Sequence, residues 1–73
     1  MRVKIRLDTG NDAIVFSNIA STLQGKITIT DSKGLCVNAK SILGMLYAME
    51  FEELWCESEN DIYSHIETFV VID

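Results

Sequence analysis

The chain has 73 residues, of which 48% are hydrophobic and 23% charged, and its 11 acidic and 6 basic side chains give a net charge of −5. This length predicts a single domain over residues 1–73, and the few, scattered basic residues argue against nucleic acid or an anionic membrane surface as a partner. No apolar run approaches the ~20 residues of a membrane span, so we expect a cytoplasmic protein whose cysteines, Cys36 and Cys56, are buried free thiols.

The amino-terminal residues predict a strand followed by a helix. Residues 2–7 alternate between basic and apolar side chains, and the apolar set is expected to face inward: Val3, Ile5 and Leu7. Thr9 and Gly10 break this strand, and Asn11 or Asp12 is expected to cap the helix that follows.

This first helix is expected to run to about Gln24, with Gly25 just after its end, where a left-handed backbone favours glycine. Its apolar stripe consists of Phe16, Ile19, Ala20 and Leu23. Residues 26–31 alternate again, and a turn over 31–34 leads into a strand over 35–37, which together predict a β-hairpin.

The second half of the chain predicts a helix, a strand and a helix. Ser41 is expected to cap a short helix from Ile42 to about Met49. Residues 51–57 are expected to form a strand whose inward side chains are Leu54 and Cys56.

Ser58 and Asp61 have the spacing of a capping box for the last helix. The expected apolar stripe of that helix consists of Ile62, His65, Ile66, Phe69 and Val70. The element order is therefore strand, helix, strand, strand, helix, strand, helix. Because every strand alternates, the sequence predicts an antiparallel sheet covered on one face, in an α/β two-layer (α+β) fold.

Residues 37–46, Val-Asn-Ala-Lys-Ser-Ile-Leu-Gly-Met-Leu, closely resemble the segment of the HPr family of phosphocarrier proteins that carries a regulatory serine. That family has the same element order, and a weaker similarity extends over nearly the whole chain. The resemblance implies an open-faced sandwich: a four-stranded antiparallel sheet in the order 1-4-2-3 with the helices on one face.

The segment that would carry phosphate departs from the family. HPr proteins of the sugar phosphotransferase system have a histidine at the start of the first helix, in a Gly-x-His-Ala-Arg-Pro pattern, whereas here Gly10 is followed by Asn11 and Asp12. A phosphocarrier needs an imidazole nitrogen that forms a labile phosphoramidate, and the only histidine is His65, near the other end of the chain. We therefore expect no enzyme, and no catalytic, cofactor-binding or metal-binding residues.

The short helix from Ile42 is apolar nearly all round. Helical spacing directs Met45, Ala48 and Met49 towards the sheet and leaves three apolar side chains outward, beside Ser41: Ile42, Leu43 and Leu46. In HPr proteins this region docks partners. These three residues, with Asn11 and Asp12 at the start of the first helix, are therefore the expected partner-binding residues, unless the first helix or its loop covers the apolar ones.

Ser41 has a structural and a regulatory interpretation, and both can hold. Its position predicts a helix cap that contributes about 1 kcal/mol. The resemblance implies phosphorylation of Ser41 by the family's serine kinase, which would place a phosphate at the positive end of the helix.

The remaining polar clusters have structural interpretations. Trp55, Glu53 and Glu57 share one strand face and are expected to meet Arg2, Lys4 and Arg6 of the first strand. His65 is expected to be a packed, hydrogen-bonded side chain. The acidic residues around the fourth strand are expected to form a solvated edge.

Together these features predict a non-enzymatic regulatory module that binds a protein partner. The expected partner is a kinase or a transcriptional regulator of the phosphotransferase network. The module itself is expected to be a monomer or a weak homo-oligomer. Two alternatives stay open: an active phosphocarrier with a non-standard acceptor, and a structural subunit of a larger complex.

Overall fold

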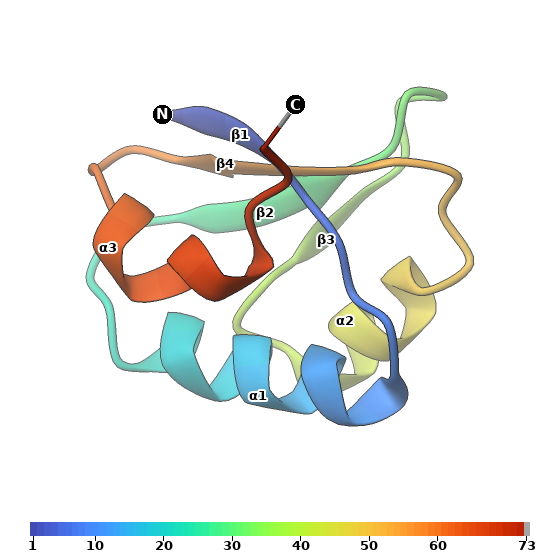
Figure 1. The fold of residues 1–73 in the computed structure, drawn as a ribbon, viewed down its shortest axis with the longest axis horizontal. Helices are drawn as coiled ribbons and strands as arrows, with labels where there is room; N and C mark the ends of the chain where they lie inside the picture. Colours follow the sequence, from blue (N-terminus) through green and yellow to red (C-terminus); the bar gives the residue numbers. More distant parts are fainter. Residues whose placement is uncertain (73) are drawn as a thin grey trace.

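The computed structural model describes residues 1–72 and contains a four-stranded sheet and three α-helices (Figure 1). In chain order the elements are β1 (Arg2–Ile5), α1 (Gly10–Ser21), β2 (Ile27–Thr30), β3 (Cys36–Asn38), α2 (Ile42–Ala48), β4 (Leu54–Ser58), α3 (Tyr63–Ile66) and a 3-10 helix, η1 (Glu67–Phe69). Each strand is shorter than, or shifted by a few residues from, the range that alternation predicted. No helix among the described residues is long and apolar enough to cross a membrane.

The strands are antiparallel and lie in the order β1-β4-β2-β3, which confirms the expected order 1-4-2-3. All the helices lie on one side of the sheet, so the molecule has two layers (Figure 1). In β4, Leu54 and Cys56 face the helices and are buried, as alternation predicted, and Trp55 between them faces the open side.

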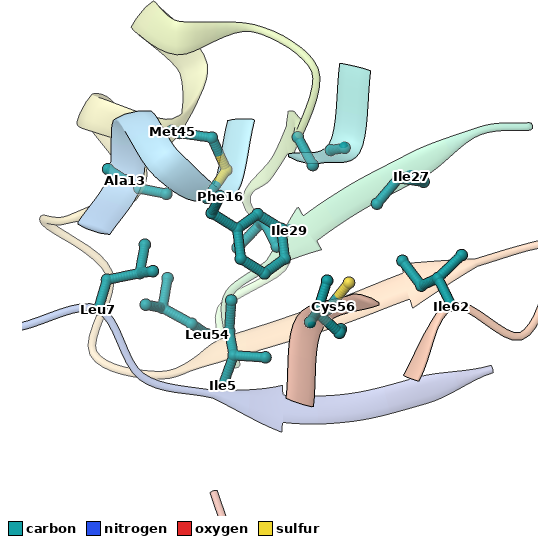
Figure 2. Close-up of a cluster of buried hydrophobic side chains, with 14 residues drawn as sticks. Ile5, Leu7, Ala13, Phe16, Ile27, Ile29, Met45, Leu54, Cys56 and Ile62 are labelled. Carbon is teal, nitrogen blue, oxygen red and sulfur yellow. The ribbon is translucent and has the colours of Figure 1, made fainter. Parts of the chain in front are cut away.

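The core fills the space between the sheet and the helices. Phe16 of α1 lies between Met45 of α2 and Ile29 of β2, and all three side chains are fully buried (Figure 2). The ring of Phe69 packs against Phe16 edge to face, with 5.3 Å between the ring centroids. A domain of this size depends on one such cluster, because it has too little interior for a second.

The first helix begins earlier than expected, and neither Asn11 nor Asp12 is its cap. Thr9 is the N-cap, with an extended backbone (φ −139°, ψ 163°), and its hydroxyl accepts a hydrogen bond from the Asp12 backbone N–H at 3.2 Å. The Asp12 carboxylate in turn accepts from the Asp8 N–H at 2.9 Å. This reciprocal pair satisfies two backbone donors, which explains why Thr9 begins the helix.

The first helix also ends earlier, at Ser21 rather than near Gln24. Thr22 is the C-cap, and its hydroxyl donates to the Ile19 carbonyl at 2.7 Å. In a longer helix this carbonyl would accept a backbone N–H instead, so the Thr22 side chain competes with continuation of the helix. Gly25 does adopt a left-handed backbone (φ +88°), and a Cβ there would lie 2.9 Å from Asn60 Nδ2. Glycine is thus required in the loop rather than directly at the helix end.

The last helix is short and lacks the expected capping box. Ser58 belongs to β4 and its hydroxyl donates to the Asn60 carbonyl, while the N-cap of α3 is Ile62, which makes no side-chain cap. His65 is exposed, contrary to the expectation that it would be packed, because only Ile62 and Ile66 of this short helix reach the core.

After η1 the chain runs along the outer side of β1. The Arg6 N–H donates to the Phe69 carbonyl at 2.8 Å, and the Val71 N–H donates to the Lys4 carbonyl at 2.9 Å. Val70 forms an antiparallel bridge with Ile5. One edge of the sheet is therefore partly covered, and β3 forms the other edge.

The two cysteines differ in exposure. Cys56 is buried and Cys36 is exposed, so the expectation of two buried thiols is wrong for Cys36. Cys36 pairs with Thr30, whose side chain faces the open side of the sheet, and this register places the Cys36 thiol on the same side.

Candidate partner-binding surface

Ser41 begins α2 as the sequence predicted. Its backbone is extended (φ −97°, ψ 120°), and its hydroxyl accepts a hydrogen bond from the Gly44 N–H at 3.1 Å. A Cβ at Gly44 would lie 3.1 Å from the Asn38 carbonyl oxygen, so glycine lets the first turn of α2 approach the end of β3 closely. The cap and this close approach fix the position of a helix only seven residues long.

The two faces of α2 differ as helical spacing predicted. Met45 and Ala48 are fully buried against the core, and Met49 packs on it. On the other face the exposed fractions are 80% for Leu43, 56% for Tyr47, 44% for Ile42 and 38% for Leu46. Spacings of three and four residues make these side chains neighbours on one helix face.

The start of α1 lies beside α2 (Figure 1). A Cβ built on Gly10 would lie 3.8 Å from Leu46 Cδ2, which is ordinary van der Waals contact. Ile14 follows one helical turn later on the same face of α1 and is 37% exposed. We define the α1–α2 apolar surface as Ile14, Ile42, Leu43, Leu46 and Tyr47.

The structure brings only part of the expected partner-binding set together. Ile42, Leu43 and Leu46 share the α1–α2 apolar surface, and exposed Asn11 adjoins Gly10 beside it. Asp12 lies two residues after Gly10, about 200° around α1, and therefore on another side of that helix. The contribution of Ile14 was missed, because it depends on how α1 is rotated against α2.

Asp12 instead borders a polar hollow of about 280 Å³ between the start of α1 and the carboxyl-terminal segment. Arg6 and Asp8 also line it, and they form an ion pair of 3.0 Å. Asp12 and Asp8 place two carboxylates beside the first turn of α1, which disfavours an approaching phosphoryl group there. His65 belongs to α3, which lies over the opposite, carboxyl-terminal end of α1 (Figure 1).

The open face of the sheet carries part of the contacts that alternation predicted, and Lys4 lies opposite Trp55 in the strand register. The Arg2 guanidinium lies 4.1 Å from the centroid of the Trp55 ring and pairs with Glu57 at 3.8 Å. Trp55 Nε1 donates to Glu53 at 2.9 Å. Arg6 is an exception, because it pairs with Asp8 of the following loop. These contacts satisfy the indole and favour the structural interpretation of Trp55.

Metal and thiol chemistry find little support in residues 1–72. No group of three or more His, Cys, Asp or Glu side chains within that range is close enough to hold a metal ion. Burial raises the pKa of the Cys56 thiol to about 11, which keeps it protonated and unreactive at neutral pH.

Comparisons with known proteins give no match to a protein-family model, to a curated protein or to a solved structure.

Proposed function

We propose that this chain is a non-enzymatic regulatory domain that binds a protein partner through the α1–α2 apolar surface. The observation that carries the proposal is the exposure of five large apolar side chains where two helices meet, with Leu43 80% exposed. Contiguous apolar patches of this kind mark interaction sites on small domains, because water contact with them is unfavourable.

A relationship to the HPr family is part of this proposal. It is supported by the sheet order β1-β4-β2-β3 and by the segment over residues 37–46, in which Ser41 caps α2. In this interpretation the domain is a degenerate member that has kept the scaffold and lost phosphoryl transfer. Its partner would be a kinase or a transcriptional regulator of the phosphotransferase network.

The loss of phosphoryl transfer follows from the chemistry of the α1 start. Asn11 has no nucleophile comparable to imidazole, and the Asp12 carboxylate already accepts a hydrogen bond from the Asp8 N–H at 2.9 Å. An aspartyl phosphate at Asp12 would also require a cation to offset its charge, and the adjacent Arg6 is paired with Asp8.

Ser41 is the proposed point of regulation. Ser41 is a half-buried residue and directly precedes Ile42 of the apolar surface. A phosphate there would add a charge of −1.5 to −2 beside the surface without removing the oxygen that caps α2.

Photo-crosslinking in cells tests the surface. A benzophenone amino acid replaces Leu43 in one variant and Ile72 in a matched control, because both side chains are 80% exposed. We expect a discrete protein adduct from position 43 and none from position 72. Equal labelling from both positions, or no adduct from position 43, would contradict the proposal.

Intact-mass measurement tests the phosphorylation chemistry. The protein is incubated with the first enzyme of the phosphotransferase system and phosphoenolpyruvate, and separately with the serine kinase and ATP. We expect one phosphate from the kinase, lost in Ser41→Ala, and none from the first enzyme. Phosphate gained from the first enzyme would instead support a phosphocarrier with a non-standard acceptor. A stable oligomer that does not respond to Ser41→Asp would support a structural subunit.

A further inference from the structure

A pocket of about 330 Å³ lies where β1 and β4 separate. The pairing of these strands ends at Ile5 and Leu54, and no pairing joins residues 6–7 to residues 51–53. Both of these unpaired segments line the pocket. Its volume falls within the range of small-molecule sites, roughly 300–1,000 Å³. We call it the β1–β4 pocket.

Much of the lining of the β1–β4 pocket is apolar. Ile5, Leu7 and Leu54 are buried residues that lie close together beneath the helices (Figure 2). Met49 and Phe51, which follow α2, are partly buried against the core and complete the apolar part of the lining from the other side. The pocket therefore offers contact to a small aliphatic or aromatic group.

The Leu7 backbone supplies a hydrogen-bond donor to this pocket. The preceding N–H, that of Arg6, donates to the Phe69 carbonyl at 2.8 Å on the outer side of β1. The Leu7 side chain is buried like that of Ile5, so the chain still alternates here, and the Leu7 N–H points to the opposite side, towards β4. Within residues 1–72 this N–H has no hydrogen-bond partner. A ligand that brings an acceptor would satisfy it.

Four charged residues line the pocket, and Lys4 is the one whose charge is left over. The other three are each bonded to a residue outside the pocket: Arg6 to Asp8 at 3.0 Å, Glu52 to Lys33 at 2.9 Å and Glu53 to Trp55 Nε1 at 2.9 Å. Lys4 is half-buried, and its ammonium forms no ion pair with any residue of the described range 1–72. The unsatisfied polar groups at the pocket are thus a cation and an N–H, and both are donors.

We infer that the β1–β4 pocket binds a small monocarboxylate with an apolar body. The carboxylate accepts hydrogen bonds from the Leu7 N–H and the Lys4 ammonium, and the body lies against Leu54 and Phe51. An ammonium ligand would be repelled by Lys4, and a neutral ligand would leave this charge unpaired. The inference goes beyond the proposed function and does not depend on it, because no residue of the α1–α2 apolar surface lines this pocket.

Two probes of the same shape test the inference by NMR titration of the full chain labelled with ¹⁵N. One is 3-phenylpropionate, and the other is its neutral amide, 3-phenylpropionamide. The titrations use about 150 mM salt, which screens the net charge of −5 that would otherwise repel an anion. We expect saturable shifts centred on the Leu7 amide, and binding of the neutral probe that is weaker by at least about threefold.

Variants of the protein locate the carboxylate. Lys4→Gln keeps most of the side chain and removes its charge, and we expect it to weaken binding of 3-phenylpropionate about threefold. Lys26→Gln makes the same change of net charge at a residue that does not line the pocket, and it should leave binding unchanged. The dispersion of the amide spectrum shows that each variant is folded.

Each of three outcomes would overturn the inference. The first is the absence of a saturable shift at the Leu7 amide. The second is equal affinity for the two probes, which would mean that the carboxylate is not recognised. The third is an equal loss of affinity in Lys4→Gln and Lys26→Gln, which would indicate non-specific attraction of an anion. None of these results bears on crosslinking from position 43, so the proposed function stands or falls separately.

Discussion

Ser17 is a buried side chain in the middle of α1 whose hydroxyl has no hydrogen-bond partner in the described part of the chain. A buried hydroxyl without a partner loses its bonds to water and gains nothing in return. We predict that Ser17→Ala raises the free energy of unfolding by about 1 kcal/mol, since alanine removes the hydroxyl and is the better helix former. Urea denaturation followed by circular dichroism measures the change.

Ser21, one turn later in the same helix, provides the matched control. It is an exposed residue, and its hydroxyl lies within hydrogen-bond distance of the Ser17 carbonyl at 2.8 Å and the Lys40 carbonyl at 3.3 Å. Ser21→Ala should therefore leave stability unchanged or lower it slightly. A loss of stability in Ser17→Ala would show that its hydroxyl is satisfied in solution.

Cys56 makes stability depend on pH in the alkaline range. Burial raises the pKa of its thiol from the ordinary value of 9.0 to about 11 in the folded protein. Because the folded-state pKa is the higher one, this contribution is fully present below pH 9 and is lost as the pH rises towards 11. We predict a decline of about 2 kcal/mol over that window, measured by urea denaturation.

Cys56→Ala removes this titration and serves as the reference, because every other ionisable group is the same in both proteins. It is expected to be less stable at neutral pH but to show a shallower decline above pH 9. Parallel curves for the two proteins would refute the assignment of the decline to Cys56.

At the scale of elements, α2 depends on its N-cap residue, Ser41. Ser41 accepts the Gly44 N–H at 3.1 Å, and a helix of seven residues has little stability of its own. We predict that Ser41→Ala lowers the free energy of unfolding by about 1 kcal/mol, whereas Ser41→Asp, which keeps a capping oxygen, stays within about 0.5 kcal/mol of the native value. Thermal and urea denaturation compare the three proteins, and equal losses in both variants would argue against a capping role.

The elements could be predicted from the sequence more reliably than their ends. Alternation identified the strands, and the Leu54 and Cys56 side chains face inward as expected, because a half-buried strand imposes a period of two. The helix ends were harder, since several polar residues compete to cap each one. Thr9 prevailed over Asn11 because its hydroxyl and the Asp12 carboxylate satisfy two donors together.

The exposed residues of the candidate surface could be predicted where they depend on the periodicity of a single helix. The outward position of Leu43 follows from the periodicity of α2 alone, and its exposed fraction of 80% agrees. The rotation of α1 against α2 determines that Ile14 belongs to that surface and that Asp12 lies away from it. That rotation is a property of tertiary packing, which one helix pattern does not contain.

At the scale of the whole molecule, the carboxyl-terminal segment joins the two layers. Phe69 packs against Phe16 in the core, while its carbonyl accepts the Arg6 N–H on the outer side of β1. We predict that Phe69→Ala lowers the free energy of unfolding by about 2 kcal/mol and speeds hydrogen exchange at the Arg6 and Val71 amides. Hydrogen exchange is measured by NMR, and the amides between β2 and β4 should exchange more slowly than those of Arg6 and Val71 in this variant.

Equal acceleration of hydrogen exchange at all amides would contradict a local role for this segment. Phe69→Leu keeps much of the apolar volume and should show a smaller effect.

The strand order itself was expected from the resemblance over residues 37–46, since alternation identifies strands without showing which strands are neighbours.

The two sides of the sheet are unequal in a way that limits how it can be extended. Residues 69–71 lie along the outer side of β1. At β3, the residues on either side of Cys36 are the ones whose backbone groups bond to β2. Because antiparallel strands alternate in this way, the backbone amide and carbonyl of Cys36 point away from β2. A fifth strand from another polypeptide would therefore align beside Cys36. The β3 edge is thus the more open of the two edges, and it carries the exposed thiol of Cys36.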